Sequence, residues 1–395
     1  MKKMKICGII CEYNPFHNGH AYLIEKAKRD SGCDALVCVM SGNFTQRGEP
    51  AVLDKYVRAR HAVLAGADAV IELPAAFAVS PAEIFAKGAV KLLASVPAFS
   101  VLAFGCESGD RESFLTTAQT LSAESKEMRS SIREKLKSGM SLIRARHEAA
   151  KQSGDALTPA LLSSPNNVLG VEYQKALLFF ESTASAMPVL RRGGAHADKT
   201  LQKDFSSATA IRAAAKEGKL RAIRKNVPPF VFEDLKSLAD LSAYKKIAVY
   251  AALSRPAEEL KNILDCTEGL ENRIKALAKS NPDYDALIPK VTTKRYISSR
   301  IRRILAAAVL GIDGDLIKRS LKNKLYLNVL AIKKESSDAL LSELSRSEFH
   351  LLLRRSDEKL LSARAAECYA KDLLAEDVYA FLSGKQAHGG KTLFL

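Results

Sequence analysis

Short apolar runs alternate with amphipathic segments over the first part of the chain. Four runs are apolar enough to be strands buried on both faces, and turn residues or a proline bound them. These predicted strands are Ile6–Ile10, Ala35–Met40, Ala69–Leu73 and Ser100–Phe104. The segments between them carry apolar residues at helical spacing, over residues 21–28, 54–65 and 82–96. This alternation predicts a doubly wound α/β fold with a parallel sheet.

The pattern changes after the fourth predicted strand. Residues 111–162 read as charged helices, which predicts a helical insertion that covers the site, and Met187–Leu190 is a fifth predicted strand. Most of the remainder reads as helices, with one strand near Val329–Ile332. The predicted helices there span 239–254, 257–263, 269–278, 293–310 and 337–344. We therefore expect an α/β domain over residues 1–220 and a mostly helical, basic region over 221–395.

Composition places the chain among soluble globular proteins, with 47% hydrophobic and 26% charged residues. It has no run of about twenty apolar residues, so we expect no membrane span. The start, Met1 to Lys5, runs directly into the first predicted strand without an apolar leader, which predicts a cytoplasmic protein. Seven scattered cysteines without Cys-x-x-Cys spacing indicate reduced thiols and neither a disulfide framework nor a zinc site.

The net charge of +16 indicates a class of binding partner. It comes from 60 Lys and Arg against 44 Asp and Glu, and a chain this basic is expected to bind a polyanion. The imbalance is strongest over Lys290–Lys334, where twelve basic residues face only Asp313 and Asp315. A solvated helix face would look the same, but the imbalance favours contact with an RNA or DNA backbone. The candidates for such contacts are Lys294, Arg295, Arg300, Arg302 and Arg303.

The most informative stretch lies between the first strand and the first helix, from Glu12 to His20. His17 and His20 are three residues apart, so both rings share one face if the helix begins near His17. Unpaired backbone N–H groups at such a helix start attract phosphate, and Gly19 allows a flat ligand to approach. Two imidazoles there suit the charge that develops when a nucleotide α-phosphate is attacked. The simpler alternative is a surface pair or a pair of core histidines, and Cys11 is more simply a small buried thiol.

A second stretch, Ser206 to Arg212, matches the first. Ser207 and Thr209 offer hydroxyls at a helix start and Arg212 follows within two turns, which together can hold the far phosphates of ATP. Alone, this pattern is no more than a common helix cap. Arg191-Arg192-Gly193-Gly194 suits a phosphate or a carboxylate, although a solvated turn looks alike, and Asn166-Asn167 is either a cap or part of a site.

With these motifs located, a resemblance can be named. The chain resembles the HIGH-type nucleotidyltransferase superfamily and, more closely, the bacterial tRNA(Met) cytidine acetate ligase family. The resemblance covers nearly the whole chain and is densest in the first 110 residues. The matching segments are Glu12–His20, Met40–Pro50, Val70–Pro74, Phe104-Gly105, Pro165–Gly170, Ser206–Arg212 and Lys294–Tyr296.

The resemblance implies a Rossmann-like fold and an ATP-dependent ligase. Such an enzyme activates acetate as acetyladenylate and acetylates N4 of the wobble cytidine of elongator tRNA(Met), with Mg²⁺ on the triphosphate and no metal site of its own. It implies catalytic roles for His17 and His20, and a basic C-terminal region that holds the tRNA. The implied ATP-binding residues are Ile10, Cys11, Glu12, Tyr13, Asn14, Pro15, Phe16, His17, Asn18, Gly19, His20, Gly105, Asn167 and either Arg191 or Arg192. The chain lacks an expected aromatic at Gly193–His196, which leaves the choice of arginine open.

Two other functions fit parts of the sequence. An adenylyltransferase acting on a small phosphorylated acceptor explains both motifs but leaves the basic C-terminal half unused. An RNA-binding protein with a vestigial nucleotide site explains the charge, but the intact His17, Gly19, His20, Thr209 and Arg212 count against it.

Overall fold

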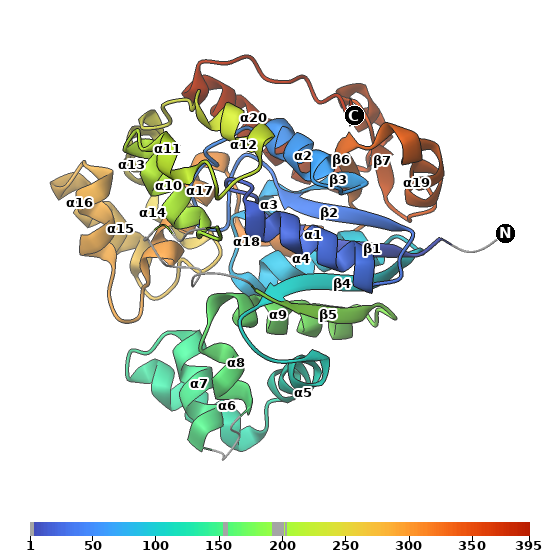
Figure 1. Ribbon diagram of the computed structural model, residues 1–395. Helices are drawn as coiled ribbons and strands as arrows, with labels where there is room; N and C mark the ends of the chain where they lie inside the picture. Colours follow the sequence, from blue (N-terminus) through green and yellow to red (C-terminus); the bar gives the residue numbers. More distant parts are fainter. Residues whose placement is uncertain (1–3, 153–156, 192–200, 202–203) are drawn as a thin grey trace.

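One mixed β-sheet forms the centre of the chain (Figure 1). The computed structural model describes residues 4–152, 157–191, 201 and 204–395, and within them eight strands run in the order β5-β4-β1-β2-β3-β6-β7, with β8 beside β6. The strands are β1 (Ile6–Cys11), β2 (Ala35–Ser41), β3 (Ala69–Leu73), β4 (Phe99–Cys106), β5 (Ser185–Leu190), β6 (Tyr326–Ile332), β7 (His350–Leu352) and β8 (Leu393–Phe394). β1 to β5 are parallel, which confirms the predicted fold class, and β6 runs antiparallel to β3.

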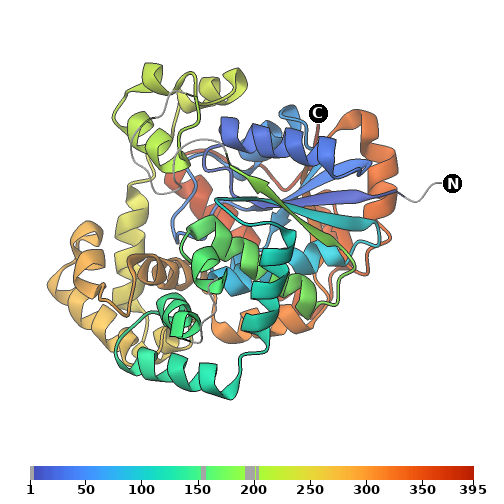
Figure 2. The same ribbon diagram turned by 60° about the horizontal axis from the view of Figure 1, so that its bottom comes forward.

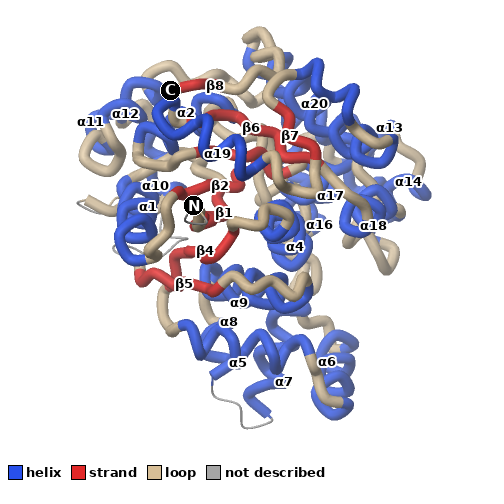
Figure 3. The backbone as a smooth tube through the Cα atoms, turned by 90° about the vertical axis from the view of Figure 1, so that its right-hand side faces the viewer, coloured by secondary structure: helices blue, strands red, loops and turns tan. Residues whose placement is uncertain are grey.

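Alternate side chains of the central strands enter two separate apolar cores. In β1, Ile10 packs into the core shared with α3 (Ala75–Ala78) and α4 (Ala82–Ala94), while Ile9 packs into the core shared with α1 (Asn18–Asp30) and α2 (Lys55–Leu64). Figure 3 shows the two helix layers on opposite faces of the sheet. Gly8 permits the close approach of α4, because a Cβ there would lie 2.7 Å from Leu93 Cδ1. Burial on both faces explains the near-continuous apolar character of these strands.

Residues 111–162 fold as helices that lie beyond β5, at the bottom of Figure 1. They are α5 (Arg111–Ser122), α6 (Lys126–Lys137), α7 (Leu142–Gln152) and α8 (Leu157–Leu162). The chain returns to the sheet through α9 (Pro165–Phe179), which begins with a proline, a residue suited to the first helical position. The fifth predicted strand is confirmed as β5, which begins two residues earlier than predicted.

The chain beyond residue 204 is mostly helical, as expected, and also extends the sheet. Its helices are α10 (Ala208–Lys216), α11 (Leu220–Ile223), α12 (Pro229–Leu235), α13 (Ala243–Ser254), α14 (Ala257–Lys261), α15 (Leu270–Ser280), α16 (Tyr284–Val291), α17 (Ser298–Leu310), α18 (Gly314–Lys322), α19 (Ser337–Leu344) and α20 (Ala363–Ser383), with 3₁₀ turns at Lys334–Ser336 and Arg355–Leu360. The yellow and light-orange helices on the left of Figure 2 face the end of the sheet where the parallel strands finish, whereas darker orange helices lie near the N-terminus on the right. The predicted strand near residue 329 is confirmed as β6, whereas β7, β8, α12, α16, α18 and α20 had no counterpart in the sequence pattern. Strands from both sides of residue 220 share the sheet. The predicted division into two domains at that residue stays a prediction.

A buried group of charges joins the last long helix to the sheet. Lys55 of α2 lies with its Nζ 2.9 Å from Glu72 Oε2 of β3 and 3.0 Å from Glu376 Oε2 of α20. Burial alone would lower the pKa of Lys55, but the two carboxylates outweigh it and raise that pKa. Asn328 of β6 donates to Glu72 at 2.7 Å. Breaking such a group by removing one charge is strongly destabilising, because it leaves an uncompensated buried charge.

Asp372 lies one turn before Glu376, and its ionisation makes the stability of the folded chain depend on pH. It accepts hydrogen bonds from the Ala75 N–H at 2.6 Å and the Tyr326 hydroxyl at 2.5 Å. Burial, followed by the nearby Glu72 carboxylate, raises the pKa of Asp372 to about 8. The unfolded value is about 3.9, so between pH 4 and 8 the unfolded chain releases a proton that the folded chain keeps. This group therefore lowers stability progressively as the pH rises through that window.

We predict that Asp372→Asn, which cannot lose a proton, gains stability relative to the parent chain as the pH rises from 5 to 8. The expected gain is at most about 1.4 kcal/mol per pH unit, measured by urea unfolding at each pH. Asp377→Asn is the matched control, because Asp377 is an exposed aspartate on the same helix. An Asp372→Asn difference that stays constant with pH, or that equals the control, would contradict this assignment.

Candidate active site

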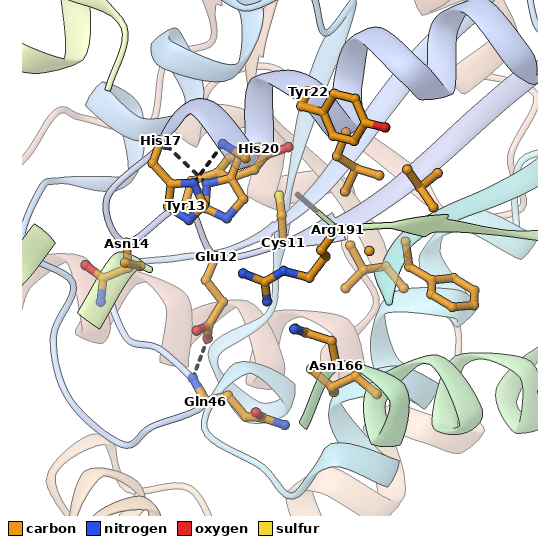
Figure 4. Close-up of a pocket in the computed structure, with 18 of the residues that line it drawn as sticks. Cys11, Glu12, Tyr13, Asn14, His17, His20, Tyr22, Gln46, Asn166 and Arg191 are labelled. Carbon is orange, nitrogen blue, oxygen red and sulfur yellow. Dashed lines mark hydrogen bonds between the residues drawn. The ribbon is translucent and has the colours of Figure 1, made fainter. Parts of the chain in front are cut away.

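A deep cleft opens at the carboxyl ends of β1, β4 and β5. It encloses about 1260 Å³ including its open mouth, and its walls come from the starts of α1, α9 and α10 and from the loop after β2 (Figure 4). Ligand sites in open parallel sheets occupy this position. The predicted ATP-binding residues that line it are Ile10, Cys11, Glu12, Tyr13, Asn14, His17, Gly19, His20, Gly105, Arg191 and Arg212. The two predicted motifs, almost two hundred residues apart, therefore meet at one cleft.

His17 and His20 form a stacked pair at the start of α1. His17 is the N-cap, and its Nδ1 accepts the Gly19 N–H at 3.1 Å, while His20 Nδ1 accepts the His17 N–H at 3.3 Å. The ring centroids are 3.7 Å apart. Because each Nδ1 is an acceptor, the proton of each neutral ring sits on Nε2, and both rings can donate a hydrogen bond to an oxyanion. This reciprocal capping begins α1 at Asn18, three residues before the predicted helical segment 21–28.

The backbone of this helix start differs from the expectation. The predicted unpaired N–H groups are already bonded, since Asn18 N–H donates to Asn226 O at 3.0 Å and His20 N–H to His17 O at 2.9 Å. Gly19 N–H is bonded to His17 Nδ1, as described. The expectation of a backbone phosphate cradle at α1 is therefore wrong. The groups this turn offers to a ligand are the imidazoles, and Gly19 is needed because a Cβ there would lie 3.0 Å from His17 Cε1.

A fully buried arginine holds the loops that carry these residues. Arg58 of α2 is 0% exposed, and its guanidinium donates to Leu53 O at 2.9 Å, Glu12 O at 2.6 Å and Ser41 O at 3.0 Å. It also donates to Gly42 O. The ends of β1 and β2 and the start of α2 therefore converge on one side chain. The sequence analysis placed Arg58 within a helix and assigned it no role.

Glu12 connects the same two loops from inside the cleft. Its Oε1 accepts the Gln46 N–H at 2.6 Å, as Figure 4 shows, and the Ser41 hydroxyl at 3.4 Å. Gln46 and Arg47, in the loop after β2, line the cleft although they were absent from the predicted site. Their position after a buried parallel strand was the signal that could have indicated them.

Three arginines make the cleft cationic. Arg212 donates to Asn14 O at 2.5 Å and to Thr209 Oγ1 at 3.2 Å. Burial, and next the nearby Arg47, lower the pKa of Arg212 to about 10, so it stays charged at neutral pH. On the opposite wall, burial also lowers the pKa of Arg191, and its Nη1 lies 3.8 Å from Glu107 Oε1. Partly buried cations of this kind favour a polyphosphate.

Several predicted residues support the cleft and do not line it. Phe16 is fully buried with its ring 4.8 Å from that of Tyr13, and Pro15 follows a cis peptide bond. Asn18 Nδ2 donates to Lys225 O at 2.7 Å. Ser207 caps α10 by accepting the Ala210 N–H at 3.1 Å, and Thr209 accepts from Arg212. Contact between these five side chains and ATP stays a prediction.

The two asparagines at the start of α9 have different surroundings. Asn167 is fully buried, and its Oδ1 accepts the Glu107 N–H at 2.9 Å, which shapes the loop after β4. Asn166 lines the cleft in its place. Arg191 lines the cleft and Arg192 lies outside the described residues, so the choice between the two stays open. Other lining residues without a local sequence signal are Tyr22, Leu23, Phe85, Phe104, Leu169 and Tyr173, which reach the cleft through helix packing.

The predicted RNA-binding arginines make contacts within the protein. Arg295 pairs with Glu268, Arg300 Nε donates to Asp265 O at 2.9 Å, and Arg302 Nη1 lies 3.3 Å from Glu49 Oε1. Burial lowers the pKa of Arg303, whereas Lys294 is exposed. None of the five lines the cleft. Their role toward RNA stays a prediction.

Burial raises the pKa of Cys11 well above its ordinary value, so its thiol stays protonated, and all seven cysteines are free thiols. No group of three potential metal ligands occurs among the described residues. None of the described helices combines the length and apolarity needed to span a bilayer.

Comparison with known proteins defines the class. The model of the HIGH Nucleotidyl Transferase family matches residues 4–392, and the chain belongs to this family. Among its relatives are proteins named tRNA(Met) cytidine acetate ligase. The one from Caldanaerobacter subterraneus subsp. tengcongensis is 37% identical over 95% of both chains, and that of Clostridium botulinum strain Langeland is 36% identical over 88% of this chain and 91% of its own.

Solved structures agree with this placement. The apo crystal structure of Thermotoga maritima TmcAL has a TM-score of 0.90 and 28% identity, covering 99% of this chain and 100% of that one. A second structure of that protein, bound with alpha-thio ATP, has a TM-score of 0.88 with the same identity and coverage.

We predict that the two roles of His17 can be separated. His17→Asn keeps an N-cap acceptor and removes the Nε2 donor, so it should unfold within about 0.5 kcal/mol of the parent chain yet bind a non-hydrolysable ATP analogue at least about tenfold more weakly. His17→Ala should bind equally weakly and lose about 1 kcal/mol of stability. Calorimetric titration and urea unfolding measure the two effects. Unchanged affinity in His17→Asn would exclude a donor role.

We predict that Arg58→Lys destabilises the chain by about 2–4 kcal/mol, although it keeps the charge. A lysine cannot satisfy several carbonyls in different directions, and buried acceptors left without a donor are expensive. Arg60→Lys is the control on the same helix, because Arg60 is 40% exposed and pairs only with Asp234. Equal urea midpoints for the two variants would show that Arg58 does not organise the loops.

Proposed function

We propose that this chain is an ATP-dependent ligase that activates acetate as acetyladenylate and acetylates N4 of the wobble cytidine of elongator tRNA(Met) in the cytoplasm. The observation that carries the proposal is the meeting of the His17–His20 pair and Arg212 at one cationic cleft. The chain aligns along almost its whole length with relatives that bear this name. A fold shared with nucleotidyltransferases accounts for the first half of the reaction, and the basic charge accounts for an RNA substrate.

The first step forms a bond between an acetate oxygen and the α-phosphorus of ATP, while the bond to the β,γ-pyrophosphate breaks. The Nε2–H groups of His17 and His20 donate to the phosphate oxygens on which negative charge grows. Arg212, fixed by Asn14 O and Thr209, binds the phosphates that leave. The Cys11 thiol plays no part, because acetate itself is the nucleophile.

In the second step the exocyclic amine of cytidine attacks the acetyl carbon, and AMP leaves with its electron pair while the amine loses a proton. Mg²⁺ enters with ATP as part of the substrate. Among the described residues that line the cleft, Glu12 is the sole carboxylate, and it accepts the Gln46 N–H, so the ion would be held mainly by the phosphates of ATP and by water. The cleft therefore fits a metal carried on ATP.

We predict that the purified protein exchanges radiolabelled pyrophosphate into ATP only when acetate is supplied. Acetate must attack before pyrophosphate leaves, so reversal of the step requires the acid. Changing both lining histidines to alanine should lower the exchange rate by at least about 10²-fold, the size of effect expected on losing oxyanion donors. Exchange without acetate would contradict the proposal.

The two alternative functions predict different results in this assay. Pyrophosphate release that requires a small phosphorylated acceptor would support an adenylyltransferase, and RNA binding without any exchange would support a vestigial site. Nucleoside analysis of tRNA from cells with and without this gene provides the decisive comparison. N4-acetylcytidine should be present in tRNA(Met) with the gene and absent without it.

A further inference from the structure

A short basic segment stands beside the cleft and takes no part in the chemistry described so far. The end of α10, all of α11 and the turn after it hold five exposed cations against one acid, Glu217. We call this segment the basic rim. Its cations are Lys216, Lys219, Arg221, Arg224 and Lys225.

The basic rim is attached directly to the catalytic helix. Asn18, between His17 and Gly19, donates through Nδ2 to Lys225 O at 2.7 Å and through its backbone N–H to Asn226 O at 3.0 Å. Arg212, about one helical turn before the first cation of the basic rim, donates to Asn14 O at 2.5 Å. Figure 1 shows α10 and α11 beside the start of α1. The turn that carries Lys225 is therefore bonded to the residue after His17, although none of the five rim cations lines the cleft itself.

These cations are largely uncommitted within the described part of the chain. The ion pair found for them is that of Lys219 Nζ with Glu217 Oε2, at 2.7 Å. Arg224 lies over the Phe232 ring at 5.9 Å, a contact that leaves its N–H groups available. The arginines of 295–302, by contrast, are bonded to Glu268, Asp265 and Glu49. Exposed cations without acidic partners are the groups that phosphate can engage with release of counterions.

We propose that the basic rim binds the sugar–phosphate backbone of the anticodon arm of the RNA substrate and so delivers the wobble base to the cleft. This inference rests on the proposed function. A base that enters the cleft leaves its own flanking phosphates just outside the mouth, within the roughly 8–10 Å over which charges act at physiological salt. The cations on the segment bonded to Asn18 are therefore the ones that those phosphates meet, and sequence-independent backbone contact needs only charge.

The test replaces Arg221, Arg224 and Lys225 by glutamine in the full-length chain. The dissociation constant for tRNA(Met) should rise at least about tenfold at 0.1 M salt, and the slope of log K against log salt should fall in magnitude by about 2–3. The pair Arg221→Lys with Arg224→Lys keeps the charge and should bind as the parent chain does. Acetate-dependent pyrophosphate exchange should be unchanged in both, which also shows that they are folded.

The matched control changes three exposed lysines to glutamine at the opposite end of the sheet. Lys5 precedes β1, and Lys333 and Lys334 follow the antiparallel β6, so all three lie at the amino ends of the parallel strands. This variant should bind tRNA as the parent chain does. Equal weakening in control and rim variants would show a non-specific charge effect and overturn the proposal, as would a rim variant that binds normally. A parent chain that exchanges pyrophosphate but never acetylates tRNA would instead overturn the proposed function.

Discussion

The geometry of the cleft depends on one buried guanidinium. Arg58 donates to carbonyls of Glu12, Ser41, Gly42 and Leu53, which lie at the ends of two parallel strands and the start of a helix. Loops at the carboxyl ends of strands have no ladder to fix them, so their carbonyls must find donors elsewhere. A planar fork with five donors can serve several directions at once, which an amine cannot. The position of Glu12, and with it the path toward His17, follows from this one side chain.

The same principle explains how distant parts of the chain are joined. Lys55 stands three residues before Arg58 on the same helix and is held by Glu72 and Glu376. One helix of ten residues thus fixes the ligand-binding loops with one cation and the C-terminal helix with another. Buried charges satisfied in this way tolerate few alternative arrangements, because any shift leaves a charge without a partner. The sheet and α20 consequently share a single geometry despite their separation in sequence.

Much of this could be predicted from the order of residues, and the exceptions have physical causes. The five parallel strands follow from near-continuous apolar runs, and the His17 and His20 rings lie together as their three-residue spacing predicts. The 21-residue helix α20 was not predicted, because its buried face carries Asp372 and Glu376 where a periodic pattern requires apolar residues. The carboxylates are there to meet Lys55 and Tyr326, partners that no local pattern reveals.

Some residues of the site could be predicted from the local sequence, and others line the cleft because distant segments meet. The histidine pair and the Ser207 cap are local and were identified from spacing, whereas Arg47, Asn166 and Tyr173 line the cleft only because separate loops and helices converge. Expectations for the charged residues changed most. Arginines of the segment 294–303 read as an RNA surface from composition, yet the fold supplies Glu49, Asp265 and Glu268 to meet them.

Net charge identifies the class of partner, but only three-dimensional neighbours decide which cations remain available to it. Asn18 is the residue that connects the cleft to such cations. It sits between His17 and Gly19, and its side chain holds the turn that carries Lys225. The residues that position phosphate chemistry and those that remain free for an RNA backbone are therefore attached to the same helix start. A shift of α1 would move both together, because Asn18 bonds the turn to the helix start through its side chain and its backbone N–H.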